Sequence, residues 1–452
     1  MPIADLLHDM NPAWMDPRAR AASRFPVRRK LHAQLLQHLS SSERRAAVML
    51  GPRQVGKTTL LLQLADDLVD KVGVAPPNVT YFDFSDDRLP LEGISPRDVV
   101  DFAPPGVRQD QPRFFLFDEV GRGARWAQWL KHAVDARHGR FIVTDSASTL
   151  LLQGGRESGL GRWDEYRIEA LSMREYLAFQ ALPDESLEST LRRLPSPFER
   201  YLSFGGRPEH VLAESLTDVR RRIRADTVDR AIRRDLLRYD VDVERVRELF
   251  VYLVTDSGAI FDAAARARLL QRPGASPVDR RSLEKWVRLL EETMLIVRLD
   301  PFARAATGKL AGRSYPKLYA SDHGLVVAFS GVADPLEDPA VRGRAFEAAV
   351  FRHLRECVER TDLALAYARD KRGAAEVDFV VHEGPKVRAL VEVTSGKDPT
   401  GKLEQVAAAA RDLKARRSII VHGGMEERRK GDVWLAPAPS FLLGAPEWIG
   451  GA

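Results

Sequence analysis

The chain contains almost no cysteine and no long apolar segment. Cys357 is the only cysteine among 452 residues, which excludes an intramolecular disulfide and fits a reducing compartment. No apolar run approaches the ~18 residues that a membrane-spanning helix needs, and the stretch 1–16, with three aspartates, lacks the pattern of a signal peptide. These absences together predict a cytoplasmic location.

Charge of one sign is not in large excess either. The formal net charge is +5 and the pI is about 9.2, so the sequence is compatible with nucleic-acid binding without requiring it. A hydrophobic content of 44% and a charged content of 29% are typical of globular proteins. A chain of this length is too long for one core, so about two to four domains are expected.

The most specific motif is a phosphate-binding loop at residues 51–58, which read Gly-Pro-Arg-Gln-Val-Gly-Lys-Thr and match G-x-x-x-x-G-K-T. Gly51 and Gly56 allow the backbone to fold tightly around a polyphosphate, with amide groups directed at its oxygens. We expect Lys57 to reach the β- and γ-phosphates and the Thr58 hydroxyl to bind Mg²⁺. The apolar run 46–50 suits a buried strand, and 59–65 suits a helix whose N-terminus faces the phosphates.

Strands and helices alternate after the loop, as a parallel sheet requires. Further strands are expected at 79–84, 113–119 and 140–144. The strand at 113–119 ends in Asp118 and Glu119, at the carboxyl edge of the sheet beside the phosphate loop. We predict that Asp118 holds Mg²⁺ and that Glu119 activates a water for in-line attack on the γ-phosphate.

The strand at 140–144 ends in polar residues, where related ATPases place a sensor of the γ-phosphate. Thr144 is the predicted sensor, with Ser146 as the nearest rival and a plain helix cap as the other interpretation. The predicted nucleotide-binding set is Gly51, Pro52, Arg53, Gln54, Val55, Gly56, Lys57, Thr58, Thr59 and Thr144.

Several segments together resemble a widespread prokaryotic family of AAA+ ATPases. They are GPRQVGKTT at 51–59, FDE at 117–119, LSMREYL at 171–177, YLSFGGRPE at 201–209, RRD at 233–235 and KLYASDHGL at 317–325. Members of that family couple an ATPase core to a C-terminal domain similar to PD-(D/E)XK nucleases. The resemblance covers residues 30–425 and implies ATP as the nucleotide.

The resemblance also implies a ring or cluster of protomers in which a neighbour's arginine completes the site. Arg162 is the predicted arginine finger. Arg207 departs from the aromatic residue expected between GG and PE, and is either a second candidate or a solvated turn residue. Arg53 is either part of the nucleotide site or a structural clamp.

The middle of the chain predicts a winged helix, with three helices between 248 and 296 and then strands at 295–299 and 317–320. Ser276 and Pro277 are expected to open the third helix. Its outward basic residues would suit sequence-independent contact with phosphates; they are Arg280, Arg281, Lys285 and Arg288. The arginine-rich stretch 217–238 is more typical of a solvated helix face.

Three C-terminal acids have the spacing of a PD-(D/E)XK core: Glu347 on a helix at 344–360, Asp378 on a strand at 376–381, and Glu392 on a strand at 387–393. Such carboxylates would hold a second Mg²⁺. Thr394 stands where the nuclease pattern has lysine, and Lys397 is the nearest lysine downstream. An active nuclease, a degenerate domain that binds nucleic acid, and a structural module therefore all remain open.

The sequence predicts an α/β protein: a RecA-like P-loop AAA+ core with a parallel sheet, a winged-helix middle segment and a C-terminal α/β restriction-endonuclease-like domain. The predicted boundaries are an N-terminal extension at 1–30, the ATPase core at 31–190, a helical lid and winged helix at 191–335, and the nuclease-like domain at 336–452. The predicted function is Mg²⁺-dependent ATP hydrolysis by a homo-oligomer, coupled to DNA or RNA. The alternatives are an ATP-gated nuclease of a defence or toxin-like system and a nucleotide-dependent switch that binds a protein partner.

Overall fold

The chain forms two compact units, Met1–Ile168 and Glu169–Ala452, which are described separately. The first ends before the predicted core boundary at 190. The computed structural model describes residues 3–16, 25–42, 44–89, 94–123, 125–145, 161–180, 195–226, 232–233, 236, 239, 241–263, 278–302, 315–369 and 376–450.

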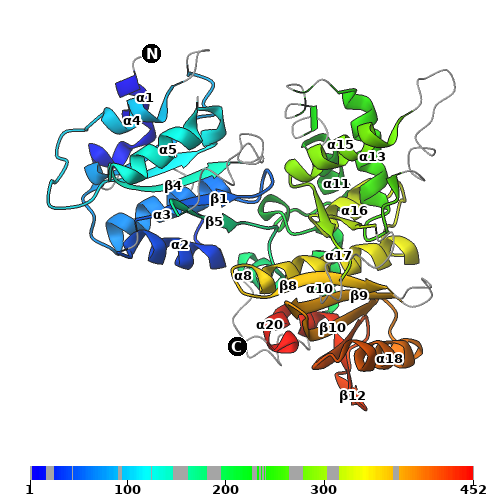
Figure 1. Cartoon of the computed structure of the whole chain (residues 1–452). Helices are drawn as coiled ribbons and strands as arrows, with labels where there is room; N and C mark the ends of the chain where they lie inside the picture. The colour runs from blue at the N-terminus through cyan, green and yellow to red at the C-terminus, as the bar shows by residue number, and fades with distance from the viewer. Residues whose placement is uncertain are drawn as a thin grey trace. The chain divides into compact units, whose positions relative to one another are not determined.

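A five-stranded parallel sheet forms the centre of the first unit (Figure 1). Its strands are β1 (Ala46–Leu50), β2 (Val79–Asp83), β3 (Phe114–Asp118), β4 (Arg140–Asp145) and β5 (Trp163–Arg167). They lie in the order β2-β3-β4-β1-β5, and all neighbouring pairs are parallel. The expected α/β architecture with a parallel sheet is confirmed, and the four expected strands lie within a residue or two of their predicted bounds. The edge strand β5 was not predicted.

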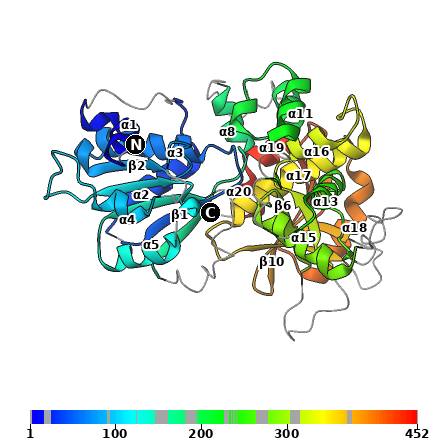
Figure 2. The same ribbon diagram turned by 90° about the horizontal axis from the view of Figure 1, so that it is seen from above.

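Helices cover both faces of this sheet, as Figure 2 shows with α3 and α5 on opposite sides. On one face α2 (Lys30–Ser40) and α3 (Lys57–Asp70) bury leucines against alternate strand residues. On the other face lie α4 (Pro96–Asp101) and α5 (Trp126–Asp135). There Trp129 packs edge-on against Phe141, with ring centroids 5.5 Å apart, and both contact Phe117. Short 3₁₀ helices at Pro76–Asn78 (η2) and Val120–Arg122 (η3) complete the connections.

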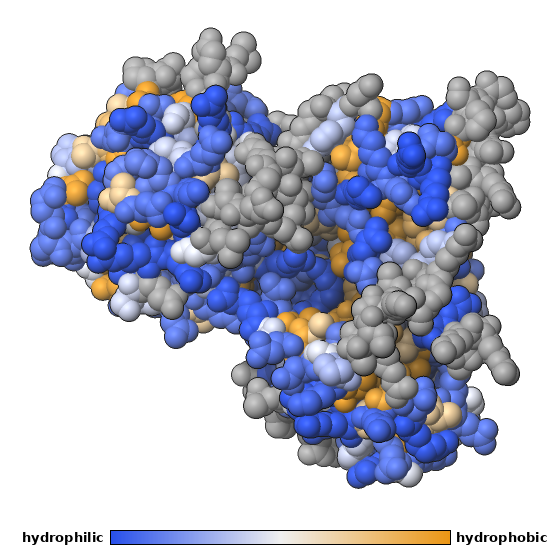
Figure 3. Space-filling view, viewed as in Figure 1, coloured by the Kyte–Doolittle hydropathy of each residue, from blue (hydrophilic) through white to orange (hydrophobic). Residues whose placement is uncertain are grey.

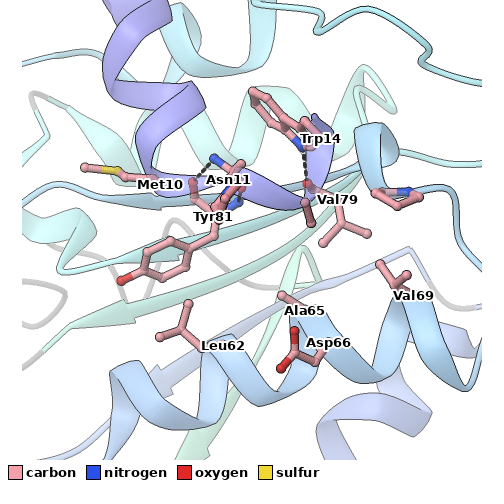
Figure 4. Close-up of a pocket in the computed structure, with 12 residues that line it drawn as sticks. Met10, Asn11, Trp14, Leu62, Ala65, Asp66, Val69, Val79 and Tyr81 are labelled. Carbon is pink, nitrogen blue, oxygen red and sulfur yellow. Dashed lines mark hydrogen bonds between the residues drawn. The ribbon is translucent and has the colours of Figure 1, made fainter. Parts of the chain in front are cut away.

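The N-terminal segment covers the edge strand β2. It consists of α1 (Ile3–Met10) and η1 (Pro12–Trp14). The Asn11 side chain accepts from the Tyr81 amide (2.7 Å) and donates to the Tyr81 carbonyl (2.8 Å), while the Trp14 indole donates to the Val79 carbonyl at 2.8 Å (Figure 4). An exposed edge strand invites pairing with other chains. This part of the predicted extension therefore belongs to the first unit and satisfies that edge.

The second unit begins with helices and a short hairpin. The elements are α8 (Met173–Phe179), α10 (Pro195–Phe204), η4 (Pro208–His210), α11 (Leu216–Ala225), α13 (Val243–Thr255), α15 (Arg280–Glu292), β6 (Ile296–Leu299), β7 (Lys317–Ala320) and α16 (His323–Phe329). Strands β6 and β7 are antiparallel. These elements are compatible with a winged helix, which stays a prediction.

Helix α15 does not begin at the predicted cap. It starts at Arg280, and the carboxylate of Asp279 accepts from the amides of Arg281 (2.8 Å) and Ser282 (3.0 Å). Asp279 is therefore the N-cap, because its side chain satisfies two amides that the first turn leaves open. The expected start at Ser276 and Pro277 is wrong, and those two residues lie outside the described ones.

A six-stranded mixed sheet completes the second unit, in the order β12-β13-β11-β10-β9-β8. Its strands are β8 (Ala364–Arg369), β9 (Glu376–Glu383), β10 (Lys386–Thr394), β11 (Arg417–His422), β12 (Arg428–Lys430) and β13 (Val433–Pro437). The helices of this part of the chain are α17 (Pro339–Val358), η6 (Thr400–Lys402), α18 (Leu403–Leu413), α19 (Ala438–Leu443) and α20 (Ala445–Ile449). Strands β10, β11 and β13 are parallel, whereas β8, β9 and β12 run antiparallel to their neighbours.

The two faces of this sheet are covered by different helices. On one face α18 packs against Val380 and Leu390. On the other face α17 places Phe351 in a stack with Phe379, with ring centroids 5.8 Å apart. The expected helix and strands are confirmed. Among the described residues, no helix is both long and apolar enough to cross a membrane.

Three of the segments that carry the family resemblance meet inside the second unit. The Leu171 amide donates to Gly206 O at 2.6 Å, and the Tyr201 hydroxyl donates to Leu171 O at 2.9 Å. Asp322 caps α16 and accepts from the Gly206 amide at 3.0 Å. Gly205 has a φ of +79° and approaches the next segment so closely that a Cβ would lie 2.8 Å from the Gly324 Cα. These motifs therefore hold the unit together.

Candidate functional site

The phosphate-binding loop connects β1 to α3 at the carboxyl edge of the first sheet. Gly51 requires glycine because an added Cβ would lie 2.4 Å from the Ile168 carbonyl oxygen. Gly56 and Gln54 have φ values of +92° and +64°, which turn successive backbone amides of the loop. A guanidinium from outside the motif, that of Arg29, donates to Val55 O at 2.9 Å. No sequence motif predicted this contact between Arg29 and the loop.

Lys57 is the first residue of α3 and is buried. Its ammonium donates to the carbonyls of Gly51 (2.9 Å) and Pro52 (3.0 Å), so it lies within the loop. Burial lowers its pKa, and the nearby acids Glu119 and Asp118 oppose that change. The lysine is therefore held in the loop beside the acids at the end of β3.

Asp118 accepts hydrogen bonds both from the helix that follows the phosphate loop and from the neighbouring strand β4. It is 1% exposed at the end of β3, and the Thr58 hydroxyl donates to its Oδ2 at 2.5 Å. Thr144, at the end of β4, donates to Oδ1 and is itself fully buried. The Tyr81 hydroxyl lies 3.4 Å from Oδ2. Burial raises the pKa of Asp118, while the hydrogen bonds from Thr144 and Thr58 oppose that rise.

Glu119 is half-buried and has a φ of +49°, which is uncommon for a residue other than glycine. Its amide donates to the Thr144 hydroxyl at 3.1 Å. Such backbone strain is often found at functional sites. The same hydroxyl therefore contacts both acids: it donates to the Asp118 carboxylate and accepts from the backbone of Glu119. Ser146, the rival sensor, lies outside the described residues.

The donor set fits nucleotide and Mg²⁺. The Thr58 hydroxyl and the Asp118 carboxylate are hard oxygen ligands of the kind that Mg²⁺ takes in nucleotide sites. The turned loop amides and the N-terminus of α3 suit phosphate oxygens. Thr59, Pro52 and Val55 belong to the same loop and first turn, and Arg53 is half-buried within it.

The predicted arginine finger, Arg162, lies at the end of the first sheet where the strands begin, whereas the phosphate loop lies at the end where they finish. Arg162 precedes β5, and its carbonyl accepts from the Ala46 amide at the amino end of β1. Because β1 and β5 are parallel, Arg162 is at the sheet edge opposite the phosphate loop. Its Nε donates to Asp135 at 3.0 Å. Arg162 therefore does not contact the loop of its own chain.

Arg207 is buried, with 4% exposure, so of its two predicted roles that of a solvated turn residue is wrong. Burial lowers its pKa, and the acids Asp322 and Glu209 oppose that change. Arg207 lies in the segment 201–209, which contacts the segments 171–177 and 317–325 inside the second unit.

Two of the three predicted C-terminal acids, Glu347 and Asp378, lie around a lysine that the sequence did not indicate. The Lys317 ammonium of β7 lies 2.7 Å from Glu376, 3.3 Å from Asp378 and 3.8 Å from Glu347. Burial alone would lower the pKa of Lys317, but these carboxylates raise it above its ordinary value.

Glu392 completes the group from β10. Its Oε2 accepts from the Asp378 amide at 3.3 Å, and its Oε1 pairs with Lys402 at 2.7 Å. Burial, together with the charge of Asp378, raises the pKa of both Glu347 and Glu392. Lys402 is thus the lysine beside the strand acid, and the nearer Lys397 is exposed. Within the described part of the chain, no group of three or more His, Cys, Asp or Glu side chains is arranged to hold a metal ion.

Comparison with known families agrees with the loop geometry. Residues 43–177 match a family model described as AAA domain. Residues 196–336 and 342–441 match two models, each described as a domain of unknown function (DUF8612 and DUF4143). No curated protein matches the chain significantly.

Solved structures give only weak similarity. The Saccharomyces cerevisiae Hsp104–ADP complex is 14% identical with a TM-score of 0.32, over 63% of this chain and 41% of that chain. The Aeropyrum pernix ORC1 protein in complex with DNA is 14% identical with a TM-score of 0.28, over 69% and 92%. Caenorhabditis elegans PCH-2 is 16% identical with a TM-score of 0.24, over 38% and 49%. The chain thus spans less than half of the Hsp104 chain.

The loop, the acids at the end of β3 and the family match define a P-loop ATPase domain of the AAA class. This domain occupies residues 43–177 of the chain. The two regions that follow it have no assigned role in the matching families.

Proposed function

We propose that this chain hydrolyses ATP with Mg²⁺ at the site between the phosphate loop and β3. The observation that carries the proposal is the direct contact of the Thr58 hydroxyl with Asp118 at 2.5 Å. Thr58 and Asp118 would hold Mg²⁺, which when bound neutralises charge on the β- and γ-phosphates. Lys57 would contact the same phosphates, since it is the loop lysine and lies beside these acids.

Glu119 is the proposed general base. It directly follows the metal-holding Asp118, and its backbone is fixed by Thr144. A carboxylate in this position would orient a water and accept its proton as the water attacks the γ-phosphate. Thr144 is then a positioning residue, because it contacts both acids.

We propose that Arg162 serves the site of a neighbouring protomer. It lies at the sheet edge opposite its own phosphate loop, so it would act only across an interface. An arginine supplied in this way stabilises charge that develops on the γ-phosphate. A homo-oligomer is therefore part of the proposal, and mixing Lys57→Ala with Arg162→Ala protein would restore activity if the two sites are shared.

Hydrolysis is proposed to be coupled to nucleic acid through the second unit. The basic residues predicted to face outward from α15 are exposed: Arg280, Arg281, Lys285 and Arg288. Strand β12 is a second exposed basic segment, with the sequence Arg-Arg-Lys. The visible surface over both elements is largely hydrophilic (Figure 3). Such surfaces suit contact with phosphates that is independent of sequence.

The test is ATP hydrolysis with and without single-stranded DNA, duplex DNA and RNA, with wild type compared with Glu119→Gln. Stimulation by one polymer that Glu119→Gln abolishes supports the coupled ATPase. Hydrolysis that no polymer changes refutes the coupling and favours the switch that binds a protein partner. Cutting of a polymer that depends on Asp378 would favour the ATP-gated nuclease.

A matched pair of variants locates the coupling. The change Arg281→Gln, Lys285→Gln and Arg288→Gln removes three exposed charges from α15. The control removes three exposed charges at the end of α18, at Arg411, Lys414 and Arg416. Loss of polymer stimulation only in the α15 variant, with basal hydrolysis unchanged in both, supports contact through α15.

A further inference from the structure

Tyr81 connects the N-terminal segment to the carboxylate that is proposed to hold Mg²⁺. Asn11 bonds both backbone groups of Tyr81, since it accepts from the amide at 2.7 Å and donates to the carbonyl at 2.8 Å. The Tyr81 ring belongs to the core between the sheet and α3, and its hydroxyl donates to Asp118 Oδ2 at 3.4 Å. One residue therefore contacts both the segment that covers β2 and the acid at the end of β3.

Three hydroxyls surround the Asp118 carboxylate, and each comes from a different element. They are those of Thr58 on α3, Thr144 on β4 and Tyr81 on β2. A tyrosine hydroxyl carries its proton at neutral pH, so Tyr81 acts as a donor. Strand β4 is interior, whereas β2 is at the edge of the sheet. The position of Tyr81 therefore depends also on what covers that edge.

The N-terminal segment does not pack tightly against α3 beside Tyr81. A cavity of about 50 Å³ lies between them, and Met10, Leu62 and the Tyr81 ring are among its lining residues (Figure 4). Close packing would leave no such space. Hydrogen bonds from Asn11 and Trp14 to the backbone of β2 are thus what fixes the segment here. Loss of these bonds would free the Tyr81 backbone on its outer side.

We propose that Tyr81 is a further positioning residue of the ATPase site, and that the N-terminal segment controls it through Asn11. With the segment on β2, the Tyr81 hydroxyl restrains the carboxylate of Asp118, which would ligate Mg²⁺. With the segment displaced, Asp118 keeps only the donors from α3 and β4. The inference rests on the proposed ATPase function and deepens it, because it makes hydrolysis depend on a segment outside the ATPase motifs.

The test is a double-variant cycle in the full chain. Tyr81→Phe keeps the ring and removes the hydroxyl, and Asn11→Ala removes both bonds to the Tyr81 backbone. We expect each change to lower kcat, and to weaken Mg²⁺-dependent binding of a fluorescent ATP analogue, by about 3- to 10-fold. Binding without Mg²⁺ should stay within about twofold of wild type. Because both changes act through one contact, the double variant should be no slower than Tyr81→Phe alone.

Tyr166→Phe is the matched control. Tyr166 is also buried and lies on β5, the other edge strand of the same sheet, but its hydroxyl contacts His38 at 3.0 Å. Its loss should leave kcat and Mg²⁺-dependent binding within about twofold of wild type. A fall as large as that of Tyr81→Phe would show that removing any such hydroxyl has this effect, and would overturn the positioning role.

Two further outcomes overturn the inference alone, in a wild type whose hydrolysis Glu119→Gln abolishes. One is a Tyr81→Phe protein with unchanged kcat and Mg²⁺-dependent binding. The other is an equal effect of Asn11→Ala with and without the Tyr81 hydroxyl, since the segment would then act by another route. If Asn11→Ala does not fold, Asn11→Asp replaces it, because it keeps the oxygen that accepts from the Tyr81 amide. A wild type that hydrolyses no ATP refutes the proposed function, and this inference with it.

Discussion

Replacement of Thr144 by valine tests whether one hydroxyl positions both acids of the ATPase site. Valine has nearly the same shape but no hydroxyl, so Asp118 loses a donor and the Glu119 amide loses its acceptor. A hydrogen bond to a carboxylate contributes about 1.5–3 kcal/mol, and one between neutral groups about 0.5–1.5 kcal/mol. Because only the part that bears on the transition state slows the reaction, we expect a total of about 1.5–3 kcal/mol. That corresponds to a kcat about 10- to 150-fold lower.

The assay combines steady-state ATP hydrolysis with binding of a fluorescent ATP analogue. Thr144→Val should reduce kcat and leave nucleotide affinity within about threefold, because the loop is unchanged. The pH profile gives a second readout. The Thr144 hydrogen bond lowers the pKa of Asp118 against the effect of burial, so its loss should move the acidic limb of the rate profile to higher pH.

Thr144→Ser is the matched control, because it keeps the hydroxyl and loses only a methyl group. It should hydrolyse ATP at close to the wild-type rate. The positioning role is refuted if Thr144→Val is as active as wild type, or if Thr144→Ser loses as much activity as Thr144→Val.

Three further predictions concern stability. Asn11→Ala removes both side-chain hydrogen bonds to the edge strand β2. It should lower the free energy of unfolding of the first unit by about 1–3 kcal/mol. Faster amide hydrogen exchange confined to β2 would confirm the cause. Asp322→Asn removes the charge that accepts from two glycine amides and should lower the calorimetric melting temperature of the second unit, whereas the exposed Asp218→Asn should not. His353 is buried and its pKa is lowered to about 3, so its stabilising contribution is complete above pH 6.5 and is lost as the pH falls from 6.5 toward 3. The urea midpoint should therefore fall over that range in wild type and fall less steeply in His353→Gln, and equal slopes would refute the assignment.

Local patterns predicted the parts of the fold that depend on neighbouring residues. The phosphate loop, the strand before it and the helix after it follow from one continuous segment, and Asp118 follows from a continuous apolar strand. Strand β5 was missed because Asp164, Glu165 and Arg167 interrupt its apolar pattern. It lies at an edge of the sheet, where one side of a strand can remain polar.

Contacts between distant segments were not accessible from spacing alone. Lys317 is 61 residues from Asp378, and no pattern within either segment links them. The lysine beside Glu392 is Lys402, ten residues further on, because η6 turns the chain back toward β10. A motif search looks for a lysine two residues after the acid. In the structure, Lys402 at the end of η6 supplies the positive charge beside Glu392 instead.

One short segment joins the acids around Lys317 to the motif contacts that hold the second unit together. Lys317 begins β7, and Asp322 follows its end at the cap of α16. Lys317 pairs with acids of α17 and β9, and the Asp322 carboxylate accepts from the Gly206 amide. Because so few residues separate them, a movement of β7 large enough to withdraw the lysine must also strain the contact between Asp322 and Gly206. The ion pairs of Lys317 should therefore be weaker in Asp322→Asn, and faster amide hydrogen exchange of β7 in that variant than in wild type would show that the two contacts are coupled.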